Sequence, residues 1–189
     1  MMDYLFRDKI NKFTMHIGRT IGRTGISPNS LTILGFLLAI VSAYALSRGE
    51  WMIGGFLLLF SSVFDVFDGA VARAYGKVSN FGNYFDAVTD KYGEGLILIG
   101  VGMGSGEWLL SSVALLGSIM CSYTRHRVDY IMAKLSDLNK VGILERAERT
   151  VILGVGCMLG YVVPALWIIC IFANLTSLLR IINAKKLLS

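Results

Sequence analysis

Apolar runs recur along the chain and are separated by short polar stretches. A helix needs about 20 predominantly apolar residues to cross the ~30 Å hydrocarbon core of a bilayer. Because the runs approach that length, we expect each of them to form a transmembrane helix. The expected helices are 31–47, 51–72, 81–103, 107–131, 146–161 and 164–183. The pattern predicts an all-α, polytopic membrane protein with six transmembrane helices.

The first 30 residues have a different pattern, because basic residues are mixed with the apolar ones. Between residues 3 and 22, the apolar side chains that share one helical stripe are Phe6, Ile10, Phe13, Ile17 and Ile21. Such a helix is suited to the membrane interface, with its basic residues toward the lipid phosphates. The alternative is a helix that packs on the rest of the protein. We therefore expect an interfacial amphipathic segment over 1–30 and a membrane domain over 31–189.

Composition and charge support a membrane location and indicate an orientation. Hydrophobic residues make up 54% of the chain, which exceeds the ~45–50% typical of soluble domains. Of the 18 Lys and Arg residues, all but Arg48 and Lys91 lie before the first span, at the second or fourth connection, or at the C-terminal end. Because cytoplasmic loops carry the excess of positive charge, we expect both termini and these connections on the cytoplasmic side. The basic charge follows the topology and gives no indication of a nucleic-acid partner.

Four aspartates interrupt the second and third expected spans: Asp65, Asp68, Asp86 and Asp90. An ionised carboxylate in hydrocarbon is costly unless it pairs, faces water or binds a cation. By helical spacing, the first two share a face with Gly69 and Ala72, and the last two share a face with Gly82. Antiparallel neighbours would bring the four carboxylates together at the cytoplasmic end. Ligands that are all oxygen favour Mg²⁺ or Mn²⁺.

Two alternatives to metal-dependent chemistry stay open for these carboxylates. They could line the cation pathway of a small transporter, or they could form ion pairs with Arg73 and Lys91 that hold the helices together. A transporter needs carboxylates that open alternately to both sides, and it often has related halves. Here the aspartates lie toward one side, and the sequence has no second copy of their pattern. Metal-dependent phosphoryl chemistry is therefore favoured.

The two spans contain the pattern D-x2-D-G-x2-A-R-x8-G-x3-D-x3-D, which runs from Asp65 to Asp90. At every fixed position it resembles the signature of the CDP-alcohol phosphotransferase family. The segment Ser-Pro-Asn-x-Leu-Thr, from Ser27 to Thr32, and the six expected spans are similar to that family as well. The resemblance implies a phospholipid-synthesis enzyme of a prokaryotic cell membrane, typically a homodimer. Such an enzyme uses two Mg²⁺ or Mn²⁺ ions to transfer the phosphatidyl-type group of a CDP-lipid to a small alcohol, and it releases CMP.

The resemblance also implies roles for individual residues. Asp65, Asp68 and Asp86 would ligate the metal ions, and Asp90 would share the second ion and act as the general base. The CDP site would be lined by residues of the same pattern, namely Gly69, Ala72, Arg73 and Gly82. With the aspartates at the cytoplasmic end of the bundle, the active site would face the cytoplasm.

A second basic cluster lies where the fourth expected span ends and the fifth begins. Arg125 could meet Arg146 and Arg149 across this helix pair, and arginine offers paired donors to phosphate oxygens. Arginines are also common at such positions through the positive-inside rule alone. The Glu-Arg-x-Glu-Arg-Thr segment resembles that of prokaryotic enzymes that make phosphatidylinositol phosphate or archaetidylinositol phosphate, so we expect inositol 1-phosphate as the acceptor. The pair Asp90-Lys91 resembles relatives that use glycerol phosphate, and glycerol 3-phosphate is therefore the alternative acceptor.

Overall fold

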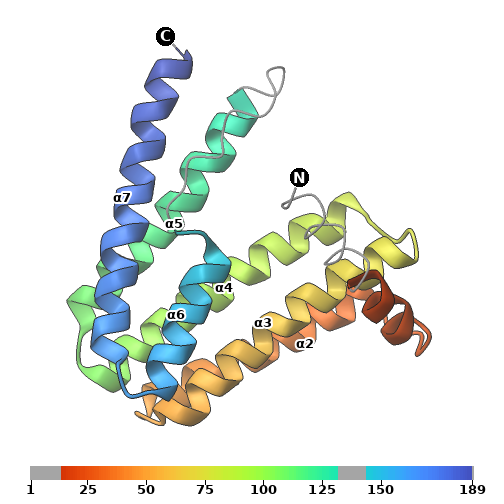
Figure 1. Cartoon of the computed structure of the whole chain (residues 1–189), viewed down its shortest axis with the longest axis horizontal. Helices are drawn as coiled ribbons and strands as arrows, with labels where there is room; N and C mark the ends of the chain where they lie inside the picture. The colour runs from red at the N-terminus through yellow and green to blue at the C-terminus, as the bar shows by residue number, and fades with distance from the viewer. Residues whose placement is uncertain (1–13, 132–143, 189) are drawn as a thin grey trace, which may run out of the picture.

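The computed structural model describes residues 14–131 and 144–188, and every regular element in these ranges is a helix (Figure 1). A short helix over 14–22 precedes the long ones. The long helices are α2 (Pro28–Ser47), α3 (Trp51–Ala74), α4 (Asn80–Ser105), α5 (Trp108–Ile131), α6 (Arg146–Met158) and α7 (Val162–Leu188). The all-α prediction is therefore confirmed for the described residues. Part of the predicted interfacial stripe, at Phe6, Ile10 and Phe13, lies outside them.

Three of the described helices have both the length and the composition of a membrane span: α2, α3 and the Val162–Lys186 part of α7. α4 is long enough, at 26 residues, but its first half carries several charged side chains. α6 is shorter than the expected 146–161, because it ends at Met158 and has 13 residues. A turn follows at Gly160, which ends the helix. Its φ of 79° lies in the left-handed region, which glycine adopts without strain.

Polar side chains at three helix starts explain where those helices begin. The Ser27 hydroxyl accepts a hydrogen bond from the Ser30 amide at 3.1 Å, and proline occupies the first position of α2. Ser79 does the same for α4, accepting from the Gly82 amide at 3.0 Å. α6 starts with a capping box, in which the side chains of Glu145 and Glu148 each bond to the other's backbone.

The described helices form two groups (Figure 1). α2 packs against both α3 and α4, and α5 lies along α7. The groups are connected by α6, which contacts α3 and α7, and by contacts between α4 and α5. Apolar residues of both groups form the core, including Leu46, Leu58, Leu98, Val101, Leu166 and Ile169. Large apolar side chains also face outward along the long helices, including Leu37, Phe56, Leu116 and Ile171. An outward-facing apolar surface of this kind is expected of helices in lipid.

Three helix ends meet at one end of this arrangement. α3 and α4 are joined by the short connection 75–79, so the end of α3 lies beside the start of α4. α6 runs antiparallel to α3, since Gly154 packs on Gly55 while Arg146 reaches Asp65. The two halves of the aspartate pattern and the start of α6 therefore lie together.

Candidate active site

Three of the four aspartates converge between α3 and α4. Asp65 comes from α3, and Asp86 and Asp90 come from successive turns of α4. Each offers one carboxylate oxygen, and the three oxygens lie within 4.8 Å of one another. The helical faces inferred from spacing thus point toward each other at these positions.

Asp68 is held by a different contact, one turn further along α3. Its side chain is buried at 5% exposure, and its Oδ2 accepts a hydrogen bond of 2.6 Å from the Thr32 hydroxyl of α2. Thr32 also donates to the Pro28 carbonyl at 3.2 Å. The contact with Asp68 was not predicted from the sequence, although the Ser-Pro-Asn-x-Leu-Thr segment contains Thr32. The start of α2 is therefore part of the site.

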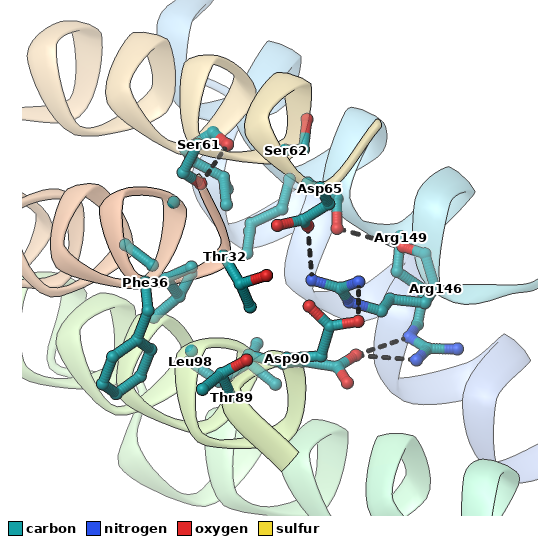
Figure 2. Close-up of a pocket in the computed structure, with 18 of the residues that line it drawn as sticks. Thr32, Phe36, Ser61, Ser62, Asp65, Thr89, Asp90, Leu98, Arg146 and Arg149 are labelled. Atoms are coloured by element: carbon teal, nitrogen blue, oxygen red, sulfur yellow. Dashed lines mark hydrogen bonds and ion pairs between the residues drawn. The ribbon is translucent and has the colours of Figure 1, made fainter. Parts of the chain in front are cut away.

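Arg146 compensates two of the clustered carboxylates. Figure 2 shows its guanidinium between Asp65 and Asp90. Nη2 donates to Asp65 Oδ2 at 2.8 Å, and Nη1 forms an ion pair with Asp90 Oδ2. The pairing considered from the sequence, with Arg73 and Lys91, is replaced here, because Lys91 pairs with Glu94 at 2.6 Å. The positive charge beside the aspartates comes from α6.

The three arginines predicted to bind the acceptor differ in their surroundings. Arg149 is buried at 3% exposure, and its Nε and Nη2 donate to Glu94 Oε1 at 2.9 and 2.7 Å. Arg125 is exposed and lies 3.4 Å from the Glu145 carboxylate. The described residues that line the cavity beside the aspartates include Arg146 and Arg149 but not Arg125. The structure therefore places two of the three in the lining of this cavity and leaves the third near the start of α6.

A fourth arginine, which was not predicted to be part of the site, reaches the same region from α7. Arg180 is buried, and its Nη1 donates to the Cys121 carbonyl at 2.5 Å. Its Nη2 lies 4.0 Å from the Glu145 carboxylate, which Arg125 also approaches. Sequence position alone gave no signal for it, because Arg180 is one of several basic residues at the C-terminal end.

The cavity has a volume of about 50 Å³ and lies between α2, α3, α4 and α6 (Figure 2). Its polar lining includes Thr32, Ser61, Asp65, Asp90, Glu94 and Arg146. Small-molecule sites usually have ~300–1,000 Å³. A sugar phosphate therefore fits only after the side chains around the cavity move, and Arg146 crosses the space between two of its walls.

The residues predicted to line the CDP site lie where α3 ends and α4 begins. Arg73 is exposed and folds back over Gly69, so that its Nη1 lies 3.1 Å from the position of a β-carbon there. A β-carbon on Gly82 would lie 3.0 Å from the Ser79 hydroxyl and 3.4 Å from Asn29 Oδ1. Ala72, one turn beyond Asp68, is half-buried. A side chain larger than glycine at position 69 or 82 would therefore be in tight contact with these neighbours.

One buried oxygen in the cluster indicates that a cation belongs there. Oδ1 of Asp86 is buried and has no hydrogen-bond partner among the described residues. A buried carboxylate oxygen without a partner is costly, and native structures seldom retain one. Together with the two neighbouring carboxylates, this donor set consists of oxygen and fits a hard divalent cation such as Mg²⁺ or Mn²⁺.

Residues 25–182 match the family model described as CDP-alcohol phosphatidyltransferase. The chain belongs to this family. It is 34% identical to the archaetidylinositol phosphate synthase of Pyrococcus horikoshii over 181 residues, which cover 95% of each chain.

Solved structures share the fold of this chain. A crystal structure of the phosphatidylinositol phosphate synthase of Mycobacterium tuberculosis with CDP-DAG bound has a TM-score of 0.78 at 23% identity, covering 92% of this chain and 94% of the other. A structure of the same synthase in complex with manganese and citrate also has a TM-score of 0.78, at 24% identity, covering 90% and 88%. At these identities the likeness establishes the fold.

Proposed function

We propose that this chain transfers the lipid-bearing phosphoryl group of a CDP-lipid to the hydroxyl of inositol 1-phosphate and releases CMP. One observation carries the proposal: the carboxylates of α3 and α4 converge with Arg146 and Arg149 in one cavity. An acceptor that already bears a phosphate needs paired positive donors beside the metal-binding carboxylates, and arginine provides them. Family membership and the 34% identity to an archaetidylinositol phosphate synthase support the same reaction.

The proposed metal ligands are Asp65, Asp68, Asp86 and Asp90, which would hold two Mg²⁺ or Mn²⁺ ions. When bound, the ions neutralise the pyrophosphate and stabilise the leaving oxygen. The unpartnered Oδ1 of Asp86 and the convergence of three carboxylates support this assignment. Arg146 would release Asp65 and Asp90 as the ions bind, because it occupies oxygens of both carboxylates.

In the reaction, the acceptor hydroxyl attacks the lipid-side phosphorus of the CDP-lipid. The new bond joins the acceptor oxygen to that phosphorus, and the bond to the CMP oxygen breaks. Asp90 takes the hydroxyl proton as general base. Gly69, Ala72, Arg73 and Gly82 line the CDP site, which is consistent with their place at the junction of α3 and α4.

The acceptor phosphate would pair with Arg125, Arg146 and Arg149. Arg146 and Arg149 line the cavity. Arg125 is exposed, and its ion pair with Glu145 places it near the start of α6. Glycerol 3-phosphate presents the same anionic group and is the alternative acceptor. The lipid is an archaeol or a diacylglycerol, and the similarity to an archaeal synthase favours archaeol.

We also propose a topology of six membrane spans with both termini and the active site on the cytoplasmic side of a prokaryotic membrane. α4, α5 and α6 would be the other three spans, in addition to the three apolar helices. The distribution of Lys and Arg supports the orientation. Residues 1–30 would lie at the interface, residues 31–189 would form the membrane domain, and the enzyme would act as a homodimer.

The decisive experiment measures CMP release by the purified protein in detergent with Mg²⁺ or Mn²⁺. CDP-archaeol and CDP-diacylglycerol serve as donors, and inositol 1-phosphate, glycerol 3-phosphate, free inositol and serine are supplied in turn. We expect metal-dependent release with inositol 1-phosphate. Release only with glycerol 3-phosphate would show that this compound, and not inositol 1-phosphate, is the acceptor. A protein that binds neither metal nor CDP, and that carries cations across vesicles, would instead be the transporter considered from the sequence.

A further inference from the structure

The short helix 14–22 lies against the last turns of α3 (Figure 1). Gly18 is buried there, and a β-carbon built on it would overlap the carbonyl oxygen of Ala70. A β-carbon on Gly22 would overlap the ring of Tyr75. The Tyr75 hydroxyl donates a hydrogen bond of 2.9 Å to the Arg19 carbonyl. The helix thus approaches α3 closely along one face, and its backbone is tied to the end of α3.

The contact point lies within the aspartate pattern but on the back of α3. Ala70 stands between the Asp68-Gly69 pair and Ala72, and at 100° per residue it points away from the face that carries Asp65 and Ala72. Ala70 is 1% exposed. The helix therefore covers a side of α3 that faces away from Asp65 and Ala72.

The chain that follows this helix contacts the site from two more directions. Asn29 Oδ1 lies 3.4 Å from the position of a β-carbon on Gly82, at the start of α4. Thr32 bonds to Asp68 at 2.6 Å. One continuous stretch, 14–32, thus touches both halves of the pattern, on α3 and on α4.

We propose that helix 14–22 positions the last turns of α3 against the start of α4, and that Gly18 and Tyr75 are positioning residues for the CDP-lipid site. This inference rests on the proposed function. Gly18 permits the close approach because it has no side chain, and Tyr75 fixes how far along α3 the helix sits. Displacing the helix shifts Asp68, Gly69 and Arg73 relative to Gly82.

Gly18→Ala tests the proposal, and Gly100→Ala is its matched control. A β-carbon on Gly100 would likewise overlap a carbonyl oxygen, that of Ala43 in α2. Gly100 lies ten residues beyond Asp90, or ~15 Å along α4. Both variants therefore place a methyl group against a helix backbone, but only Gly18 does so behind the pattern.

The readouts are the KM for CDP-lipid, the KM for the acceptor, CDP affinity by calorimetry, and the midpoint of thermal unfolding. We expect Gly18→Ala to raise the KM for CDP-lipid and weaken CDP binding about tenfold, because small displacements of reacting groups have large effects on rate and binding. The KM for the acceptor should change much less. Both variants should lower the unfolding midpoint by about the same amount, but Gly100→Ala should leave both KM values unchanged.

Tyr75→Phe gives a milder second test that keeps the ring. It removes one hydrogen bond, so we expect CDP-lipid KM to rise by a factor of about three to ten. Tyr161→Phe, at an exposed tyrosine between α6 and α7, is its control and should have no effect. An active wild-type enzyme in which Gly18→Ala and Tyr75→Phe match their controls in both KM values and in CDP affinity would overturn the proposal. An inactive wild type that binds no CDP would overturn the proposed function itself.

Discussion

Asp90 combines two properties of a general base, because it lies among the clustered carboxylates and also lines the cavity where an acceptor would bind. Its ion pair with Arg146 holds the carboxylate in place. Asp86, one turn earlier, has the buried unpartnered oxygen expected of a metal ligand. Two aspartates of the same helix thus have different surroundings, and substitutions should separate their roles.

Asp90→Asn keeps the size of the side chain and removes its basicity. We expect turnover to fall by at least ~100-fold, the usual contribution of a general base, while CDP-lipid binding is mostly retained. CMP release and CDP-lipid binding measured on the same preparation would test this. An equal loss of both would indicate that Asp90 acts as a metal ligand alone.

Arg146→Gln removes the cation that compensates Asp65 and Asp90. Leaving partly buried carboxylates unpaired should lower the free energy of unfolding of the metal-free protein by about 2 kcal/mol. Mn²⁺ should then stabilise the variant more than it stabilises the wild type, because the ions supply the missing charge. Thermal unfolding with a chelator and with Mn²⁺ measures both effects. Arg125→Gln, at an exposed position, is the control and should respond to metal as the wild type does.

Thr32→Val tests the contact between α2 and Asp68. Valine has nearly the same shape, but it leaves the buried Asp68 Oδ2 without its 2.6 Å hydrogen bond. We expect a loss of stability of about 2 kcal/mol and reduced activity. Thr32→Ser keeps the hydroxyl and should recover most of both. If valine and serine behave alike in unfolding and CMP-release assays, the hydrogen bond is unimportant.

Among the elements, α6 carries the cationic side of the site on its first turn. Arg146 and Arg149 are the first and fourth residues of the helix, and the capping box before and within that turn determines where the helix begins. The Glu145 amide donates to the Glu148 carboxylate at 2.7 Å. Helix initiation and the placement of the two arginines are therefore linked in this element.

Glu148→Ala should disturb that first turn. Loss of a cap costs ~1 kcal/mol, and we expect the KM for the acceptor to rise more than the KM for CDP-lipid, because Arg146 and Arg149 move with the turn. Glu50→Ala is the matched control, since Glu50 precedes α3 without a side-chain cap bond. Steady-state kinetics with each substrate varied in turn would distinguish the two. A larger change for CDP-lipid would contradict the assignment of α6 to the acceptor.

The helices and the faces of the aspartates could be predicted from the sequence, because helical periodicity is a local property. Asp65 on α3 and Asp86 on α4 point together as their spacing indicated. The partners of these residues could not be predicted in the same way. Thr32 and Asp68 are 36 positions apart, and Arg146 and Asp65 are 81 positions apart. Such pairs depend on how α2 and α6 pack on α3, which no short pattern specifies.

At the scale of the whole molecule, the site lies where three helix ends meet, and the proposed topology assigns that end to the cytoplasm. The connection 75–79 follows the aspartates of α3, whereas the turn between α4 and α5 lies at the opposite end of α4. The three cysteines, Cys121, Cys157 and Cys170, are all buried. Introduced thiols at exposed positions can therefore report sidedness against a low background.

Lys77→Cys and Glu107→Cys place single exposed thiols on opposite sides of the proposed topology. In intact cells, a membrane-impermeant thiol reagent should label Glu107→Cys and should leave Lys77→Cys unlabelled until the membrane is opened. Gel-shift detection of the labelled protein measures this. The reverse pattern would invert the orientation inferred from the positive charges.

Arg146 competes with metal ions for the carboxylates of the site, and it is itself part of the protein. Its guanidinium already binds one oxygen each of Asp65 and Asp90, so an incoming cation competes with it for these two oxygens. An acceptor phosphate that draws Arg146 away would release those oxygens for metal. Binding of the metal and binding of the acceptor would then favour each other to the same degree, as thermodynamic linkage requires. In an enzyme arranged in this way, metal ions bind most tightly when the acceptor is bound.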